Sequence, residues 1–342
     1  MKPHDWETPW LRNYEEGVPF SLVYPRVPVP HFLRQAAGSF PQNLAMVFAQ
    51  KKFTYQELWE KVNALAKALT ALGVKKGERV ALLLPNSPPY VIGYYASLQV
   101  GAIVVNLNPL AVERELLYFL SHAEVRTIIV AQALFFRIAN IASQSPLENI
   151  LIACLQDWGA GAKLSGEENT ARPSQGGRGI YSLETFIDKH AGGKADPVDL
   201  HPEDVALLQY SGAITDGMKG VILTHGNLVA NTLQMASWWV RARPGKEVFL
   251  SVLPFFHIYG MAVAMNLPIY FGSAMILLPR FEVRGALRAM RQFRPTIFPG
   301  VPPMFVALSQ PIDAEKFDLS SLRVCYSGGP PCPWRFWKIL KS

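Results

Sequence analysis

One segment near the middle of the sequence combines hydroxyl side chains, glycines and a lysine in a way that suits phosphate. An apolar run over residues 205–210 leads directly into it. The groups that could contact phosphate oxygens are Ser211, Gly212, Thr215, Lys219 and Gly220. Turns of this composition present backbone N–H groups to phosphate, and hydroxyl and ammonium groups add donors and charge. The common P-loop places its lysine directly after the second glycine, whereas Met218 intervenes here, so a nucleotide loop and a plain turn both remain open.

A histidine and several glycines form a second group of candidates. His257 lies in the run Pro-Phe-Phe-His-Ile-Tyr-Gly at residues 254–260, which ends at Gly260. Gly300 and the Ser-Gly-Gly-Pro sequence at 327–330 each follow a short apolar run. A lone histidine in apolar surroundings is more often a hydrogen-bonded core side chain than a reactive group. Both interpretations of His257 are therefore open from these residues alone.

Alternating strands and helices must position these segments. Thr54 and Glu57 form a capping-box pattern before a helix over residues 54–72, which Gly73 ends. Strands are predicted at 80–84, 102–105, 127–130, 205–210, 221–223, 249–253, 274–278, 297–298 and 322–326, and further helices at 89–100, 113–121, 183–189, 227–238 and 283–293. This alternation predicts an α/β protein with two doubly wound, mainly parallel-sheet units packed together.

The stretch from 156 to 202 divides the chain. It is rich in Gly, Ser, Lys and Glu, and we interpret it as a long solvated connection. We therefore assign residues 1–202 to a first α/β unit and 203–330 to a second one that carries the candidate site. Residues 331–342 differ in character and are treated as an anomalous tail.

Charge and cysteine content narrow the class of partners. The 342 residues carry a formal net charge of +7, which suits anionic partners such as nucleotides or an anionic membrane surface. Basic residues do not alternate with aromatic ones, so nucleic acid is not an expected partner. The three cysteines form no metal-binding or disulfide pattern, and Met1 to Trp10 does not resemble a signal peptide. Both observations favour a cytoplasmic protein. Peripheral contact with a membrane surface is a further option.

The segment 248–279 contains no charged residue and is long enough to cross a membrane. Four helix breakers divide it, namely Pro254, Gly260, Pro268 and Gly272. We therefore predict a buried strand–helix–strand passage here, with a membrane protein as the minor alternative.

The candidate segments together resemble the adenylate-forming (AMP-binding) enzyme superfamily, and in particular its long-chain fatty-acid–CoA ligase branch. The segment from Tyr210 to Gly220, followed by Thr224, His225 and Asn227, is similar to the phosphate loop of that family. Five other segments resemble family motifs in the same order: 80–87, 101–109, 254–260, 299–303 and 327–330. The resemblance extends over nearly the whole chain.

The resemblance implies a reaction and a set of roles. The family activates a carboxylate with ATP to an acyl-adenylate and then transfers the acyl group to coenzyme A, with Mg²⁺ and lysine stabilising the phosphate charge. The resemblance implies that the ATP phosphates are bound by Ser211, Gly212, Thr215, Lys219 and Gly220. It implies that the adenine is lined by Gly328, Gly329 and Pro330. It also implies that His257 lies near the acyl carboxylate, and that Gly260 and Gly300 leave room for the acyl chain. The expected partners are a fatty acid, ATP and coenzyme A; no metal-ligating residue is assigned, and neither acyl chain length nor oligomeric state is indicated.

The phosphate loop departs from the family pattern at three positions. Ala213 replaces a glycine, Ile214 a threonine and Asp216 a glycine. Ile214 removes a hydroxyl donor, and Asp216 brings a carboxylate toward the phosphates. Two unit charges about 4 Å apart at an effective dielectric of about 20 repel by roughly 4 kcal/mol. We therefore expect that ATP binds weakly or not at all.

Several family segments are not found in these 342 residues. They are the Tyr-Gly-x-Thr-Glu motif, the ribose-binding aspartate, the small barrel and the carboxy-terminal lid with its lysine. We therefore expect a chain that lacks the barrel and lid, holds no complete set of catalytic residues, and exposes apolar surface that favours aggregation.

The tail at 331–342 suggests one explanation. Back-translated with allowed codons and read one base later, it encodes Leu-Pro-Val-Glu-Val-Leu-Glu-Asn-Phe-Glu-Lys, a helix start of the kind that family members have there. We interpret the tail as frameshifted, which the surrounding DNA sequence would test. Two functions remain open: a fatty-acid–CoA ligase by ancestry that is inactive as this chain alone, or a non-catalytic remnant that at most binds nucleotide or acyl chains.

Overall fold

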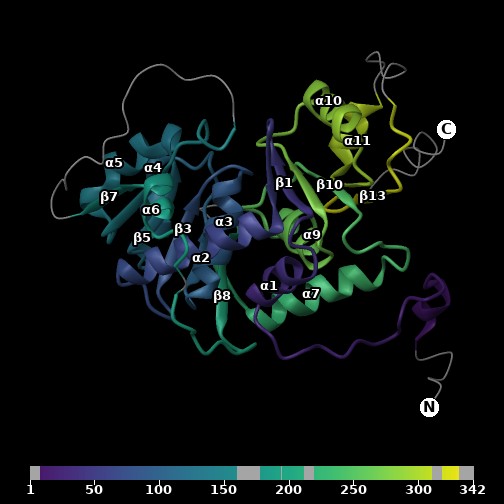
Figure 1. The fold of residues 1–342 in the computed structure, drawn as a ribbon, viewed down its shortest axis with the longest axis horizontal. Coiled ribbons are helices and arrows are strands. Elements are labelled where there is room, and N and C mark those ends of the chain that lie inside the picture. Colours follow the sequence, from purple (N-terminus) through teal and green to yellow (C-terminus); the bar gives the residue numbers. More distant parts are fainter. Residues whose placement is uncertain (1–7, 160–177, 194, 212–218, 310–317, 331–342) are drawn as a thin grey trace.

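Two β-sheets with helices between them and on their outer faces make up the structure (Figure 1). It is a computed structural model, which describes residues 8–159, 178–193, 195–211, 219–309 and 318–330. Within these residues a short 3-10 turn, η1 (Pro9–Asn13), precedes the first helix.

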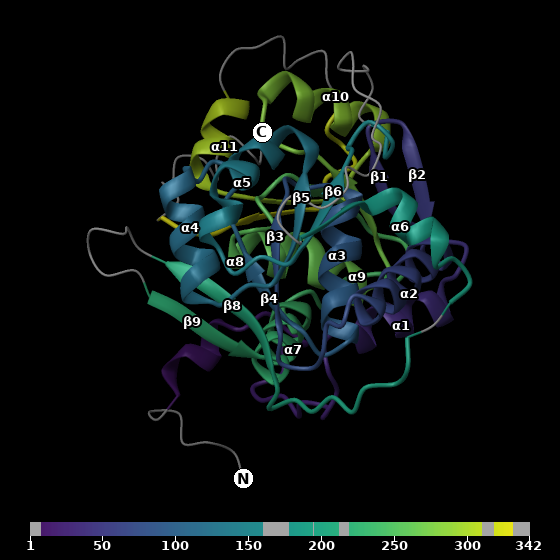
Figure 2. The ribbon, with the colours of Figure 1, turned by 90° about the vertical axis from the view of Figure 1, so that its left-hand side faces the viewer.

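The first sheet has seven strands in the order β7–β6–β5–β3–β4–β8–β9. They are β3 (Arg79–Leu83), β4 (Ile103–Asn106), β5 (Thr127–Ala131), β6 (Asn149–Ala153), β7 (Gly179–Ser182), β8 (Val205–Ser211) and β9 (Lys219–Thr224). All neighbours are parallel except β8 and β9, which pair antiparallel with Ser211 opposite Lys219. The antiparallel pair forms one edge of the sheet (Figure 2).

The second sheet has six strands in the order β13–β12–β10–β11–β1–β2. They are β1 (Leu44–Phe48), β2 (Lys51–Thr54), β10 (Val248–Ser251), β11 (Ala274–Leu277), β12 (Ile297–Gly300) and β13 (Val324–Ser327). Only the β1–β2 pair is antiparallel. The prediction of two mainly parallel sheets is confirmed.

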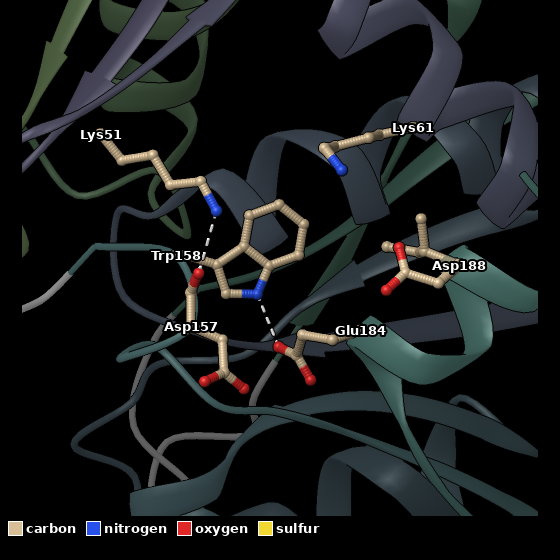
Figure 3. A pocket seen from close by; sticks show the side chains of 7 residues that line it. Lys51, Lys61, Asp157, Trp158, Glu184 and Asp188 are labelled. Atoms are coloured by element: carbon tan, nitrogen blue, oxygen red, sulfur yellow. Dashed lines mark hydrogen bonds between the residues drawn. The ribbon is translucent and has the colours of Figure 1, made fainter. Parts of the chain in front are cut away.

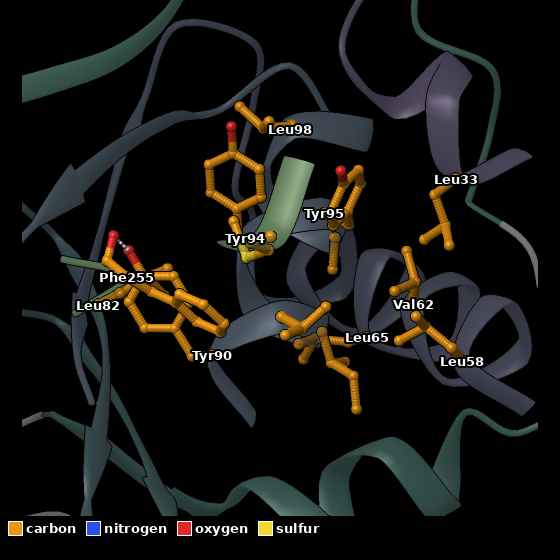
Figure 4. Packing of buried hydrophobic residues seen from close by; sticks show 14 of the residues in the cluster. Leu33, Leu58, Val62, Leu65, Leu82, Tyr90, Tyr94, Tyr95, Leu98 and Phe255 are labelled. Atoms are coloured by element: carbon orange, nitrogen blue, oxygen red, sulfur yellow. Dashed lines mark hydrogen bonds between the residues drawn. The ribbon is translucent and has the colours of Figure 1, made fainter. Parts of the chain in front are cut away.

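The helices complete a five-layer arrangement. They are α1 (Pro30–Ser39), α2 (Tyr55–Ala71), α3 (Pro88–Gln99), α4 (Glu113–His122), α5 (Phe135–Ile141), α6 (Leu183–Lys189), α7 (His225–Ser237), α8 (Ile258–Met261), α9 (Leu267–Tyr270), α10 (Val283–Phe293) and α11 (Pro302–Leu308). The largest core cluster joins α2 and α3 to the inner faces of both sheets, and it includes Leu82 and Tyr90 from the first sheet's side and Phe255 from the second's (Figure 4). Helices α4 and α5 cover the outer face of the first sheet, and α10 and α11 that of the second.

The helix predicted over residues 54–72 is α2, and the capping box is present. The backbone N–H of Glu57 donates to the Thr54 hydroxyl at 3.2 Å, and the N–H of Thr54 donates to the Glu57 carboxylate at 2.7 Å. Two otherwise unpaired donors of the first turn are satisfied in this way. A second capping box, between Thr224 and Asn227, begins α7, as predicted for Thr224.

The sheets divide the chain differently from the boundary that we placed at residue 202. Strands β8 and β9, which we assigned to the second unit, pair with β4 in the first sheet. Strands β1 and β2 lie before that boundary and belong to the second sheet through the parallel pairing of β1 with β11. Each sheet therefore contains strands from both sides of residue 202. Both pairings join segments that are far apart in the sequence.

The uncharged segment 248–279 is a strand–helix–strand passage, as predicted. It contains β10, then α8, a π-helical turn at Ala262–Asn266 and α9, and finally β11. Among the described helices, none is long and apolar enough to span a bilayer.

Candidate functional site

The predicted acyl and adenine segments meet at the carboxyl ends of three neighbouring parallel strands. β10 leads to the segment 254–260, β12 ends at Gly300, and β13 leads to Gly328. The N–H of Gly328 donates to Gly300 O at 3.2 Å, and the Tyr259 hydroxyl lies 3.4 Å from the same oxygen. The carboxyl edge of a parallel sheet is where α/β proteins commonly bind ligands.

Three of the predicted glycines allow close packing of the protein itself. A Cβ built on Gly260 would lie 2.1 Å from Pro254 O, and one on Gly300 would lie 2.9 Å from the Phe305 ring. At Gly328 the ring of Tyr259 takes the space, 2.5 Å from a built Cβ. A side chain at Gly260 or Gly300 would thus clash with protein atoms, and their place in an acyl pocket stays a prediction.

Gly329 differs from its neighbour. Its φ of +85° lies in the region that favours glycine, and the nearest atom to a built Cβ is on Val301 at 3.8 Å. Gly329 and Pro330 are both exposed. The backbone at Gly329 is therefore less closely packed than that at Gly328, and adenine binding here stays a prediction.

His257 is exposed and is not a core histidine. It precedes α8, and its Nδ1 accepts a hydrogen bond from the N–H of Tyr259 at 3.2 Å. Of the two interpretations of His257, the structure supports an accessible polar group at the rim of the site.

The structure describes the two ends of the predicted phosphate loop. Ser211 is the last residue of β8, Lys219 is the first of β9, and Gly220 pairs with Tyr210. Lys219 is exposed. Gly212 and Thr215, like Ala213, Ile214 and Asp216, lie outside the described residues.

Four polar side chains that the sequence reading did not single out join the two sheets at this edge. Asn86 lies at 2% exposure directly after β3, and it accepts from Phe255 N at 2.8 Å while donating to Leu253 O at 2.8 Å. Tyr90 is fully buried on α3, with its hydroxyl 2.8 Å from Phe255 O (Figure 4).

Asn106 and Gln209 complete this set. Asn106, the last residue of β4, accepts from the Tyr90 hydroxyl at 2.7 Å and donates to Gln209 Oε1 at 3.2 Å. Gln209 in turn donates to Phe256 O at 3.1 Å. The sequence did contain a signal for this set. Asn106 ends the apolar strand β4 and Asn86 lies three residues after the apolar strand β3, and a buried amide requires hydrogen-bond partners.

A cavity of about 420 Å³ lies beside β13, and its wall includes four charged side chains, Glu15, Arg241, Glu247 and Arg323. Trp239 and Tyr326 stack at its inner end, with ring centroids 4.6 Å apart at 12°. The apolar residues Val240, Ile297 and Val324 also line the cavity. Val324, Tyr326 and Gly328 alternate along one extended strand, so they share a face. Burial raises the pKa of Tyr326, and the hydroxyl of Tyr259 raises it further.

A second cavity, of about 310 Å³, surrounds Trp158 at the other side of the molecule (Figure 3). Lys51 and Lys61 lie within 6 Å of the Trp158 ring, at 5.9 and 5.5 Å from its centroid. Trp158 donates to Glu184 at 2.5 Å, and burial raises the pKa of Glu184. Two lysines, Lys51 and Lys61, and three carboxylates, Asp157, Glu184 and Asp188, line this cavity.

The described residues contain no cluster of three or more His, Cys, Asp or Glu side chains that could hold a metal ion.

The fold and the site define an α/β protein that presents glycine-rich segments and a lysine-bearing hairpin at the carboxyl ends of parallel strands. The chain belongs to the AMP-binding enzyme family, whose family model matches residues 33–342. A long-chain-fatty-acid–CoA ligase of Bacillus subtilis is 35% identical over 338 residues, covering 96% of this chain and 60% of that protein.

Solved structures agree with this assignment. A long-chain-fatty-acid-CoA ligase from Archaeoglobus fulgidus has a TM-score of 0.79 at 27% identity, covering 96% of this chain and 62% of the other. An ATP-bound RpMatB–BxBclM chimera has a TM-score of 0.73 at 25% identity, covering 91% and 57%. The chain thus spans about 60% of the length of the relatives that it matches.

Proposed function

We propose that this chain supplies the acyl- and nucleotide-binding part of an ATP-dependent acid–thiol ligase that converts a long-chain fatty acid to an acyl-adenylate and then to acyl-CoA. The observation that carries the proposal is a contact between the end of β8 and the segment that follows β10. Gln209, two residues before the end of β8, is hydrogen-bonded to Phe256 O, so the hairpin that bears Lys219 starts beside His257.

The nucleotide is proposed to lie across this edge. Lys219, with Ser211, Gly212, Thr215 and Gly220, would contact the phosphates, while the open backbone at Gly329 and Pro330 faces the adenine. His257 is exposed between these groups and is proposed to contact the acyl carboxylate. Bound ATP supplies the leaving group, and Mg²⁺ on its phosphates supplies charge stabilisation. Coenzyme A is the proposed acceptor.

The acyl tail is proposed to follow the face of β13. From Gly328 this face continues to Tyr326 and Val324, which belong to the apolar part of the lining of the 420 Å³ cavity. Burying apolar surface contributes roughly 25 cal/mol per Å², so a cavity of this kind favours long chains over short ones.

A second candidate is a chain that binds acyl groups without activating them. The replacements at Ala213, Ile214 and Asp216 support it, because they weaken the phosphate site without touching the acyl cavity. The two candidates differ in whether the nucleotide part of an acyl-adenylate contributes to its affinity for this chain.

The test is calorimetric titration of the 342-residue chain with palmitoyl-sulfamoyl-adenosine, a stable mimic of the adenylate. We expect binding at least about tenfold tighter than for the acetyl analogue, together with a loss of affinity of about threefold or more on Lys219→Ala. Lys52→Ala is the matched control, because Lys52 is also an exposed lysine but lies on β2, away from the hairpin. Equal affinity for palmitate with and without the nucleotide part would favour the non-catalytic candidate, and no binding of either analogue would refute both. Pyrophosphate exchange into ATP then shows whether the chain activates its ligand.

A further inference from the structure

A π-helical turn interrupts the helical passage that begins at His257. It spans Ala262–Asn266, between α8 and α9, and all of its residues are buried. A π-helical turn holds one residue more than an α-helical turn, because its hydrogen bonds join residues five apart instead of four, and such turns are frequent at functional sites. One residue of an α-helix corresponds to about 100°, so the turn offsets the residues before it by about that angle relative to those after it.

A proline is one reason for this turn. Pro268, the second residue of α9, has no backbone N–H, so it cannot donate to the carbonyl four residues before it, which is Ala264 O. The hydroxyl of Ser251 supplies a donor instead and lies 2.8 Å from Ala264 O. Ser251 is fully buried and is the last residue of β10, the strand that leads to His257. The turn is thus tied to the strand from which the passage starts.

Two tyrosines of α3 hold the end of the turn. Asn266 is 1% exposed, and its Nδ2 donates to the Tyr94 hydroxyl at 3.2 Å. Its Oδ1 accepts from the Tyr95 hydroxyl at 3.0 Å. Both tyrosines are themselves fully buried (Figure 4). An amide buried this deeply requires hydrogen-bond partners, so these two hydroxyls favour the arrangement in which Asn266 lies against α3.

The same helix holds the start of the passage. The hydroxyl of Tyr90, four residues before Tyr94, donates to Phe255 O at 2.8 Å. Residues four apart lie on the same face of a helix. Successive turns of α3 therefore fix the backbone on both sides of the segment that carries His257 and Tyr259.

The helical offset decides where the ring of Tyr259 lies. Its hydroxyl is 3.4 Å from Gly300 O, and the ring takes the space beside Gly328, 2.5 Å from a Cβ built there. A rotation of the helix start by about 100° would remove the ring from this position. His257 caps the same helix by accepting from the N–H of Tyr259, so it would move with the ring.

We propose that Asn266 is a positioning residue, which locks the π-helical turn and thereby keeps Tyr259 and His257 at the edge of the second sheet. This inference rests on the proposed function where that function assigns His257 to the acyl carboxylate. Because Asn266 is buried, it acts through the orientation of α8 and not by contact with a ligand.

The first experiment follows the ring of Tyr259 in the ligand-free chain by fluorine NMR after labelling with 3-fluorotyrosine. The chain has 12 tyrosines, and the resonance that is missing in Tyr259→Phe identifies this ring. We expect Asn266→Leu to move the resonance by more than its line width, since both hydrogen bonds to α3 are lost. The double variant Tyr94→Phe/Tyr95→Phe removes the same two bonds with the rings kept, and it should move the resonance in the same way.

The matched control is Asn63→Leu. Asn63 is also a buried asparagine bonded to a side chain of α3, because it accepts from Gln99 at 2.8 Å, but it lies on α2. Its replacement should leave the Tyr259 resonance in place. Thermal unfolding shows which variants are folded, and the double tyrosine variant decides if Asn266→Leu is not. An unchanged Tyr259 resonance in the folded variant would overturn the positioning role.

The second experiment asks whether Asn266 acts through His257. Palmitoyl-sulfamoyl-adenosine is titrated against the wild type, His257→Ala, Asn266→Leu and the combination of both. We expect His257→Ala to weaken binding about tenfold in the wild type and in Asn63→Leu, but less than about twofold in Asn266→Leu, where His257 is already displaced. A general loss of structure would instead give additive effects.

Additive losses in the combined variant would therefore overturn the proposal. An absence of any effect of His257→Ala in the wild type, or of any binding, would count against the function proposed above. The Tyr259 resonance, which needs no ligand, would then decide the positioning role by itself.

Discussion

The ring of Tyr259 occupies the space that a side chain at residue 328 would need. A Cβ built on Gly328 would lie 2.5 Å from Cζ of that ring, closer than real Cβ contacts come. We predict that Gly328→Ala displaces the half-buried ring and lowers the free energy of unfolding by about 1–3 kcal/mol, as overpacking typically does. Urea unfolding followed by fluorescence measures the change.

The control for this substitution is Gly38→Ala on α1, where nothing lies within 4 Å of a built Cβ. Its effect should be within about 1 kcal/mol and in the stabilising direction, because alanine is the better helix former. Combining Gly328→Ala with Tyr259→Leu should recover part of the loss. If Gly328→Ala is as well tolerated as Gly38→Ala, the contact between ring and glycine is not tight in solution.

The second prediction concerns the charge in the phosphate loop. Changing Asp216→Gly and Ile214→Thr together removes a carboxylate and restores a hydroxyl donor, so ATP affinity should rise by tenfold or more, on the order of 1.4 kcal/mol. Titration calorimetry of both chains provides the comparison. Asp199→Gly, at an exposed aspartate outside the loop, is the control and should leave ATP affinity unchanged. Tight ATP binding by the unaltered chain would contradict this prediction.

The third prediction is a pH dependence that arises at His225. This residue is 1% exposed, and its Nδ1 accepts from Val29 N at 3.2 Å, so the neutral ring fits and a protonated Nδ1 would face a donor. Burial lowers the pKa of His225 to about 4, with Lys76 lowering it further and Asp204 opposing. Between that value and the ordinary pKa of about 6.5, the unfolded chain binds the proton and the folded chain does not.

Stability from His225 is therefore present above pH ~6.5 and is lost as the pH falls toward about 4, by roughly 3 kcal/mol in total. Urea unfolding at several pH values should show this fall in the wild type and a smaller one in His225→Leu. The exposed His201→Gln variant is the control and should retain the wild-type slope. If stability depends on pH as steeply in His225→Leu as in the wild type, His225 is not the origin of the pH dependence.

The fourth prediction concerns Glu247, whose side chain is 1% exposed at the start of β10. It accepts from Thr296 Oγ1 at 2.6 Å and from Arg243 Nε at 3.0 Å, and it also pairs with Arg323. Burial acts to raise the pKa of Glu247, but the hydrogen bonds from these three residues outweigh it and the pKa is lowered. Glu247→Gln should cost about 2 kcal/mol, because two arginines lose their charge partner.

The sign of the pH effect follows from the lowered pKa of Glu247. Its stabilisation is present above the ordinary glutamate pKa of about 4.3 and is lost as the pH falls below that value. Thermal unfolding at pH 7 compares Glu247→Gln with Glu282→Gln, which removes an exposed pair with Arg280 and should change stability by less than about 0.5 kcal/mol. Equal effects of the two substitutions would mean that the buried cluster contributes no more than a surface pair.

Local patterns in the sequence determined most of the secondary structure of this protein. The helix α10 spans Val283–Phe293 as predicted, and the capping boxes at Thr54 and Thr224 lie where the pattern placed them. These features depend on contacts within a few residues, which spacing and residue type reveal. The order of the glycine-containing motifs likewise indicated the family before any tertiary contact was known.

The tertiary structure alone decided which segments lie together. The pairing of β1 with β11 and the contact of Asn86 with Phe255, 169 residues away, leave no periodic signal, so neither the exchange of strands between the sheets nor the residues that hold the site edge could be read from the sequence. The same holds for the glycines. A sequence shows that Gly260 and Gly328 lack side chains, but only the fold shows that a backbone carbonyl and a tyrosine ring fill the space, because close packing depends on neighbours that distant parts of the chain supply.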